Sequence, residues 1–295
     1  MEVGLWLLAL CALLLPALWL LSFLRTDTDL TLLWAAWLGR RPEQVLTGMV
    51  VWVTGASSGI GEELAFQLSK LGVSLVLSAR RTQELERVKR RCLENGNMKE
   101  RDILVLPLDL ADTSSHDTAT KAVLQEFGRI DILVNNSGIA HYSFAVDTNL
   151  DVFKLITDVN YLGTVSLTKC VLPHMMERNR GKIVIINSIA GIIPVPLCSA
   201  YSGSKHALRV LGKQARDIPK MSTSRCVWLI LVSMANDLKE VWIADQPVLF
   251  AIYLGQYMPF LDWIISKKTW GKIINQYIMD WHNYLENSCH KRPSK

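Results

Sequence analysis

Hydrophobic residues follow two different spacings between residue 49 and about residue 217. Short continuous apolar runs at 49–53, 73–77, 131–134 and 182–187 are typical of buried strands. After the first run, apolar side chains recur at the spacing that places them on one face of a helix: Ile60, Leu64, Leu68 and Leu71. Strand and helix candidates that alternate in this way predict one α/β domain with a Rossmann-like, doubly wound parallel sheet.

A longer apolar run near the start of the chain has a different character. Residues 3–24 carry no charged side chain, and these 22 residues are enough to cross a bilayer. No basic residue precedes the run, which favours a retained anchor over a cleaved signal peptide. We therefore expect a membrane anchor at 1–25, a linker at 26–48, and the α/β domain at 49–244.

Charged and aromatic residues after this run bear on orientation. Arg25, Arg40 and Arg41 weakly favour a cytosolic domain, and they leave the side of the membrane open. Trp34 and Trp37 suit a membrane interface, and packing on the domain is an equal alternative.

The remaining segment, 245–295, is an apolar and aromatic stretch followed by a basic tail. Pro259 and Asp262 interrupt its apolar run, residues 248–265, which fits an interfacial flap or substrate lid better than a second span. Ordinary core packing stays an alternative for this run.

Composition excludes several classes of function. The chain has 295 residues with a net charge of +5, and the basic residues form no stripe, so we expect no nucleic-acid partner. The six cysteines are scattered without a Cys-x-x-Cys pair or zinc spacing, so we expect neither a disulfide framework nor a metal site.

A glycine turn joins the first strand candidate to its helix. Residues 54–61 read TGASSGIG, in which Gly55 permits the turn, Gly59 brings bare backbone to a ligand, and Gly61 allows close packing. Backbone N–H groups at the start of the helix then face a phosphate. Two alternatives remain open: a hydrolase nucleophile elbow with Ser57 as nucleophile and a histidine such as His174, and a plain glycine turn.

The end of the second strand candidate indicates which dinucleotide would bind. Arg80 and Arg81 stand where an acidic residue would bind the 2′-hydroxyl of NAD, and arginine there accommodates a 2′-phosphate. This favours NADP(H), although a solvated start to a charged helix is the alternative.

Polar residues also follow the later strand candidates. Residues 135–138 read NNSG, and Ser188 closes the run at 182–187. Tyr201 and Lys205 are four residues apart, so on a helix they share a face, and an ammonium there favours the phenolate.

These motifs, in this order and spacing, resemble the short-chain dehydrogenase/reductase family. The resemblance implies that Tyr201 is the general acid or base, that Lys205 lowers its pKa, that Ser188 polarises the substrate carbonyl, and that Asn160 positions a relay water. It also implies a cofactor site along the glycine turn and neighbouring strand ends: Gly55, Ser57, Ser58, Gly59, Ile60, Gly61, Arg80, Arg81, Asp109, Leu110, Asn136, Tyr201 and Lys205. Asp109 as a turn residue and Asn160 as a local helix kink or cap are the alternatives.

The chain departs from the family after Lys205. The family's sixth strand and its Pro-Gly turn are not visible in the sequence, and we expect that about 50 residues of the family pattern are missing here. A sheet without that strand would expose an apolar edge. The run 227–232 could fill the place as a strand, but the resemblance favours a helix there.

The resemblance implies an NADP(H)-dependent oxidoreductase of the endoplasmic reticulum membrane that acts on a lipophilic carbonyl or alcohol, of the retinoid or steroid class. Membrane lipid is an expected partner, and a homo-oligomer is left open. The missing segment motivates an alternative: a catalytically impaired, membrane-anchored binding or interaction protein.

Overall fold

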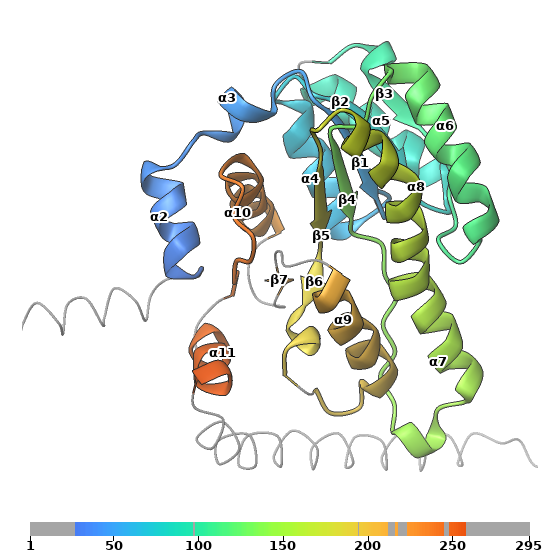
Figure 1. Cartoon of the computed structure of the whole chain (residues 1–295), viewed down its shortest axis with the longest axis vertical. Helices are drawn as coiled ribbons and strands as arrows, with labels where there is room; N and C mark the ends of the chain where they lie inside the picture. Colours follow the sequence, from blue (N-terminus) through green and yellow to red (C-terminus); the bar gives the residue numbers. More distant parts are fainter. Residues whose placement is uncertain are drawn as a thin grey trace, which may run out of the picture. The chain divides into compact units, whose positions relative to one another are not determined.

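A computed structural model describes residues 27–96, 98–193, 195–211, 216–217, 223–244 and 248–257 (Figure 1). The chain divides into two units, residues 1–249 and 250–295, and most described residues belong to the first. The anchor expected at 1–25 and the basic tail lie outside the described residues. Among the helices that are described, none combines the length and apolar character needed to cross a membrane.

A five-stranded parallel sheet forms the centre of the first unit. Its strands are β1 (Val50–Thr54), β2 (Ser74–Ser78), β3 (Ile103–Val105), β4 (Ile132–Asn135) and β5 (Lys182–Ile185). They lie in the order β3-β2-β1-β4-β5, and every neighbouring pair is parallel. The order reverses between β1 and β4, which is the switch point where ligands bind in such sheets. The Rossmann-like prediction is confirmed.

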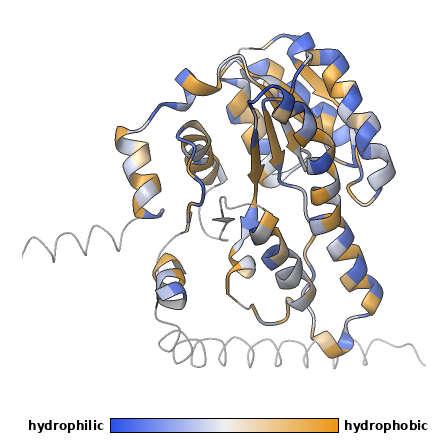
Figure 2. Cartoon of the chain, viewed as in Figure 1, coloured by the Kyte–Doolittle hydropathy of each residue, from blue (hydrophilic) through white to orange (hydrophobic). Residues whose placement is uncertain are grey.

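Both faces of this sheet are buried under helices. Alternate strand residues point to opposite sides, so Val51 and Val53 belong to one apolar cluster while Trp52 belongs to the other. The first cluster is covered by α4 (Gly59–Ser69), α5 (Thr82–Asn95) and α10 (Thr223–Ala235), and the second by α6 (His116–Phe127) and α8 (Gly163–Glu177). Figure 2 shows the resulting apolar strands between helices with polar outer faces.

Shorter elements complete the described chain. They are η1 (Glu100–Asp102), η2 (Thr113–Ser115), η3 (Ala145–Asp147), α7 (Leu150–Thr157), the π-turn η4 (Asp158–Leu162), β6 (Asn187–Ser188), η5 (Ile189–Gly191), α9 (Ser199–Leu211), β7 (Arg216–Asp217) and α11 (Val248–Tyr257). α7, η4 and α8 follow one another without a break, so residues 150–177 form a helical stretch that the π-turn widens at its middle. Of the apolar run 248–265, the structure describes the helix α11, and the residues from 258 onward lie outside.

The segment expected to be a linker is folded. It contains α2 (Leu30–Leu38) and α3 (Pro42–Leu46), and both pack against α10. Leu32 and Leu46 are fully buried in the apolar cluster that covers the first face of the sheet. Residues 27–48 thus already contain packed structure, ahead of the position 49 at which the domain was expected to begin.

No sixth strand joins the main sheet within the described residues, as the missing segment suggested. The chain instead continues from β5 into β6, which pairs in parallel with the two residues of β7. The run 227–232 lies inside α10, so the preference for a helix there is confirmed. At the start of β5, Lys182 donates to the carbonyl of Met234 (2.7 Å) and pairs with Asp237 (2.6 Å), which ties the edge strand to the end of α10.

Candidate active site

The glycine turn lies at the switch point of the sheet. Gly55 and Gly59 both have positive φ, +65° and +59°, so side-chain-bearing residues would be strained there. A Cβ on Gly61 would lie 2.3 Å from the carbonyl oxygen of Gly55, so the first turn of α4 can approach the loop only without a side chain. Ser58 caps α4 but makes no side-chain capping bond with any described residue, and it is exposed together with Gly59. The loop therefore presents backbone at the point where a phosphate is expected.

The end of β4 is bonded directly to this turn. The Asn136 amide Nδ2 donates to the carbonyls of Thr54 (3.0 Å) and Gly55 (3.3 Å). The Thr54 hydroxyl in turn accepts from the backbone N–H groups of Asn136 (3.0 Å) and Ser137 (3.2 Å). Asn136 thus holds the two central strand ends together, and its expected role beside the cofactor stays a prediction.

The structure brings Arg81 onto the glycine turn. Its Nη2 donates to the hydroxyls of Ser57 (3.2 Å) and Ser58 (3.5 Å), while Arg80 is exposed beside it. A second cation, Arg87 of α5, donates to the carbonyl of Ser57 (3.4 Å). It also forms a bidentate pair with Glu62, both bonds 2.8 Å, and the bond to Arg87 is the main reason that the pKa of Glu62 lies below its usual value.

Tyr201 and Lys205 lie on one face of α9, as their spacing predicted. The Lys205 ammonium is 5.8 Å from the centre of the Tyr201 ring, and the lysine side chain is buried. Its Nζ donates to the carbonyl of Ile186 (3.2 Å), the residue after β5, so the end of the edge strand fixes the lysine.

Ser188 stands at the end of the β5–β6 segment and begins η5. Its hydroxyl accepts from the backbone N–H of Ala190 (3.2 Å), and the residue is partly exposed. η5 packs against α9, and a Cβ on Gly191 would lie 2.6 Å from the carbonyl of Lys205. This close backbone approach brings the segment with Ser188 beside the helix that carries Tyr201 and Lys205.

Asn160 is fully buried in the π-turn η4. Its amide accepts from the N–H of Ile139 (2.8 Å), donates to the carbonyl of the same residue (2.9 Å), and donates to the Ser204 hydroxyl (3.0 Å). It therefore bridges the loop after β4 to α9, a longer reach than the local kink or cap that was the alternative. A Cβ on Gly138 would lie 3.3 Å from Asn160 Oδ1 and 3.5 Å from Lys205 Nζ, so these groups converge near one point.

Asp109 and Leu110 form a turn after β3. The Asp109 carboxylate accepts from the N–H of Ala111 (3.1 Å), which agrees with the turn alternative and leaves its exposed side at the same edge of the sheet. A Cβ on Gly163 would lie 2.2 Å from the carbonyl of Leu110, so the start of α8 holds this turn in place.

The serine hydrolase alternative is wrong for the pair Ser57 and His174. His174 lies on α8 four residues before Arg178, whose guanidinium donates to Asp131 (2.8 Å) at the amino end of β4. Ser57 follows the carboxyl end of β1. Since the strands are parallel, the two side chains lie at opposite edges of the sheet, too far apart for proton transfer.

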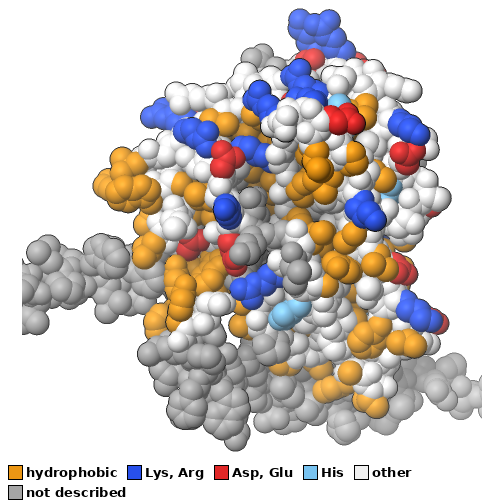
Figure 3. Space-filling view, viewed as in Figure 1, with side chains coloured by type: hydrophobic (Ala, Val, Ile, Leu, Met, Phe, Trp, Pro, Cys, Tyr) orange, Lys and Arg blue, Asp and Glu red, His pale blue; other side chains and the backbone are white. Residues whose placement is uncertain are grey.

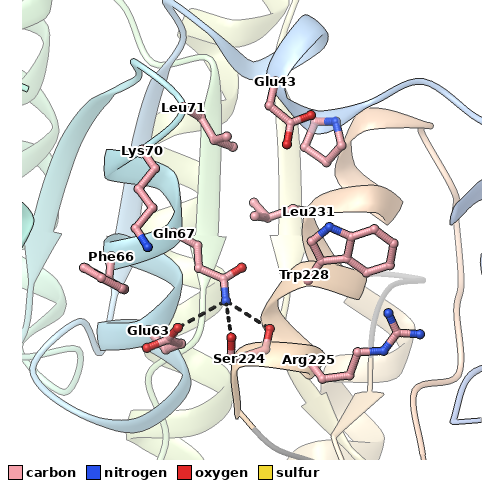
Figure 4. A pocket seen from close by; sticks show the side chains of 11 residues that line it. Glu43, Glu63, Phe66, Gln67, Lys70, Leu71, Ser224, Arg225, Trp228 and Leu231 are labelled. Atoms are coloured by element: carbon pink, nitrogen blue, oxygen red, sulfur yellow. Dashed lines mark hydrogen bonds between the residues drawn. The ribbon is translucent and has the colours of Figure 1, made fainter. Parts of the chain in front are cut away.

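A cavity of about 620 Å³ lies elsewhere, between α3, α4 and α10 (Figure 4). Phe66, Lys70 and Trp228 line it, and Gln67 donates at its base to Glu63 (3.1 Å) and to Ser224 (3.0 Å). It includes none of the residues expected to be catalytic, so we do not assign it to the reaction.

Two residues of the site were missed in the sequence. Thr54 accepts both N–H groups at the end of β4, and Ser204 accepts from Asn160 while donating to the carbonyl of Tyr201 (2.8 Å). Ser204 lies three positions after Tyr201 on the same helix, which is the signal that would have revealed it. The bonds of Thr54 join strands 82 residues apart in sequence, and no local pattern reports them.

One edge of the parallel sheet thus carries the glycine turn with Arg81 and Arg87 in contact with it. The same edge carries the buried Lys205 next to Tyr201. This arrangement suits a dinucleotide whose phosphates meet the turn and whose reactive ring reaches α9. Residues 49–220 match the short chain dehydrogenase family, and the chain belongs to the short-chain dehydrogenase/reductase family. It is therefore an oxidoreductase of a family in which a nicotinamide cofactor is typical. Within the part of the chain that the structure describes, no cluster of side chains suits a metal ion.

Two relatives within this family are similar to the chain over most of its length. Dehydrogenase/reductase SDR family member 7 of Homo sapiens is 60% identical over 317 residues, which covers 94% of this chain and 94% of the relative. The protein of the same name from Mus musculus is 64% identical over 316 residues, covering 93% and 94%. These alignments exceed the 295 residues of this chain, so both relatives carry residues that it lacks.

A solved structure shows the same fold at lower identity. A short chain dehydrogenase/reductase from Burkholderia phymatum, in complex with NAD, has a TM-score of 0.66 at 20% identity, covering 74% of this chain and 96% of that chain.

Proposed function

We propose that this chain is an NADP(H)-dependent oxidoreductase that transfers hydride between nicotinamide and a lipophilic carbonyl or alcohol of the retinoid or steroid class. The observation that carries the cofactor choice is the contact of Arg81 with Ser57 and Ser58. A guanidinium that contacts the glycine turn lies where a cation would bind a ribose 2′-phosphate. A carboxylate at this position would repel the phosphate.

The chain's own residues have distinct tasks in this reaction. The bound cofactor supplies the hydride. Tyr201 gives a proton to the carbonyl oxygen during reduction and takes it back during oxidation, while the ammonium of Lys205 favours the phenolate. Ser188 donates a hydrogen bond to the substrate oxygen, and Asn160 holds the loop and helix around a relay water.

The membrane association belongs to the same proposal. We place a single N-terminal anchor at residues 1–25 in the endoplasmic reticulum membrane, supported by the uncharged run at 3–24. An anchored domain would meet lipophilic substrates that partition into the bilayer, which supports the proposed substrate class.

The cofactor choice is tested by the substitution Arg81→Glu in the full chain. Loss of a charge-assisted bond and gain of a repulsive charge should raise the Kd for NADPH about 10- to 100-fold, with little change for NADH. The matched control is Arg90→Glu on the exposed face of α5, which should change neither affinity. Equal affinity of the unmodified chain for both cofactors would refute the NADP(H) preference.

The reaction is tested by NADPH consumption with retinal and with steroid ketones. Tyr201→Phe should lower the rate of turnover at least about 100-fold while NADPH still binds, because a general acid accelerates a reaction by about this factor or more. Turnover that survives Tyr201→Phe would overturn the assigned role.

A second candidate, a catalytically impaired binding form, is favoured by one observation. The main sheet has five strands in the described chain, and β5 is at its edge next to the two-residue pairing of β6 with β7. This candidate predicts measurable NADPH binding without turnover of any carbonyl substrate, whereas the first candidate predicts both.

A further inference from the structure

Helix α2 presents an apolar stripe to solvent. Five of its residues are spaced to share one face, and their exposed fractions are 41%, 37%, 66%, 85% and 63% for Leu30, Leu33, Trp34, Trp37 and Leu38. Figure 3 shows hydrophobic side chains gathered in this part of the surface. Large apolar side chains that adjoin one another on a surface mark an interaction site more often than isolated ones do.

The opposite face of α2 is fixed to the domain. Leu32 and Ala35 are buried against α10. Asp29 caps the start of the helix: its N–H donates to the carbonyl of Trp242 (2.7 Å), and its carboxylate accepts from the N–H of Leu32 (2.9 Å). The stripe is therefore part of a rigid surface, and whatever binds it orients the whole α/β unit.

The far end of α2 is fixed as well. The N–H of Arg40 donates to Asn236 Oδ1 (2.6 Å), and the Arg40 guanidinium pairs with Asp237 (2.7 Å). The neighbouring side chain of Arg41 is exposed.

The sequence before α2 indicates what covers the stripe. The uncharged apolar run ends at residue 24, and five residues separate it from Leu30. Five residues span at most about 18 Å, so an inserted run would hold α2 within reach of the headgroup region. Tryptophan and leucine suit that region, and an exposed arginine such as Arg41 suits lipid phosphates.

We propose that the Trp-Leu stripe of α2 docks on the lipid bilayer interface, with α2 parallel to the membrane, and that this contact sets the orientation of the catalytic domain. The inference rests on the membrane anchor of the proposed function. A second copy of the chain is the competing occupant, and the experiment separates the two.

The test uses the full chain, with Cys11, Cys170 and Cys289 replaced by serine, reconstituted in phosphatidylcholine–phosphatidylserine vesicles. An environment-sensitive fluorophore is attached after Trp37→Cys, and in a matched control after Met176→Cys, an exposed apolar position on α8 at 69%. α8 belongs to the opposite face of the sheet from α2. Flotation on a density gradient reports whether the protein is held by the vesicles.

We expect lipid-borne nitroxides to quench the label at position 37 at least threefold more than the label at 176, with the reverse order for aqueous iodide. Flotation with equal iodide quenching at both positions overturns the docking and leaves the anchor standing. Absence of flotation removes the anchor, and the docking fails with it. Protection at position 37 that appears in detergent and is lost on dilution assigns the stripe to a second copy and also overturns the inference.

Discussion

At the scale of single residues, Asp131 is a buried charge held by three hydrogen bonds. Its carboxylate accepts from the N–H of Val50 (2.9 Å), from Arg129 (2.9 Å) and from Arg178 (2.8 Å), and the residue is buried. Burial alone would raise the pKa of Asp131, but these three bonds outweigh it and hold the pKa below its usual value. One side chain thus joins the amino ends of β1 and β4 to the end of α8.

Asp131→Asn should lower the free energy of unfolding at pH 7 by about 3 kcal/mol, the low end for a broken buried pair because both arginines are partly exposed. A lowered pKa in the folded state gives stability that is present above the unfolded pKa, near 3.9, and is lost as pH falls through the folded value. The difference between the two proteins, measured by urea unfolding, should be constant from pH 7 to 5 and shrink below about pH 4.

The matched control is Asp117→Asn, which removes an exposed carboxylate paired with Lys121 on α6. It should change stability by less than about 0.5 kcal/mol. A difference between wild type and Asp131→Asn that grows toward acid would contradict the pKa direction.

Gly61 shows how a missing side chain positions the cofactor loop. A Cβ there would lie 2.3 Å from the Gly55 carbonyl and 2.6 Å from the Asn136 amide, and both are held by other bonds. Gly61→Ala should therefore lower stability by about 2 kcal/mol through overpacking, and it should weaken NADPH binding.

Gly203 of α9 supplies the comparison, because a Cβ there would meet nothing within 4 Å. Gly203→Ala should raise stability by up to about 1 kcal/mol, as alanine favours a helix over glycine. Thermal unfolding of the two variants distinguishes the crowded glycine from the open one. Equal shifts in Tm would show that α4 can move away from the loop.

At the scale of elements, the central strands and the helix after the glycine turn were predictable, and α2 and α3 were not. The strands β1 and β4 are short apolar runs, and each is followed directly by glycine and small polar residues. The local sequence pattern is therefore sufficient to predict these strands. α2 is apolar on both its buried and its exposed faces, so no periodicity distinguishes helix from linker. Its fixing bonds go to Trp242 and Asn236, about 200 residues away, and only the folded structure brings these together.

α10 supplies many of the buried apolar side chains that cover the first face of the sheet. Most of its residues from Cys226 to Ala235 are buried, and it packs against α2, α3 and α4. Leu229→Ala should cost about 3 kcal/mol, the usual range for a fully buried leucine, and lower the urea midpoint without changing the m-value. Thr223→Ala, at an exposed position of the same helix, should change stability by at most about 0.5 kcal/mol. A small effect of Leu229→Ala would mean that α10 is loosely attached and covers the sheet poorly.

At the scale of the whole molecule, the expected site residues come from at least five separate elements. The turn before α4, the ends of β2 and β4, the short strand β6 and the helix α9 each supply one part. Motif order predicted this set because the carboxyl ends of parallel strands meet at one edge of the sheet. Hydrogen bonds hold these site residues together: Asn136 bonds to Thr54, and Asn160 bonds to Ile139 and Ser204. These bonds join residues 21 to 82 positions apart, so no local sequence pattern predicts them.

Because the site spans these elements, cofactor binding should stabilise the fold as a unit. At a NADPH concentration 100 times its Kd, linkage predicts about 2.7 kcal/mol of added stability, or a rise in Tm of about 5–10 °C for a domain of this size. The scan is run on the full chain in detergent with NADPH and separately with NADH.

Gly59→Val is the control for this rise. It places a β-branched residue at a φ of +59° in the expected phosphate loop, where a Cβ meets no neighbouring atom. Its own Tm should fall modestly from backbone strain, and NADPH should no longer raise it. A rise that persists in this variant would mean that the cofactor binds away from the glycine turn. A wild-type chain with no rise at saturating NADPH or NADH would mean that the five-stranded form does not hold the cofactor, and the proposed reaction would then be lost together with the site.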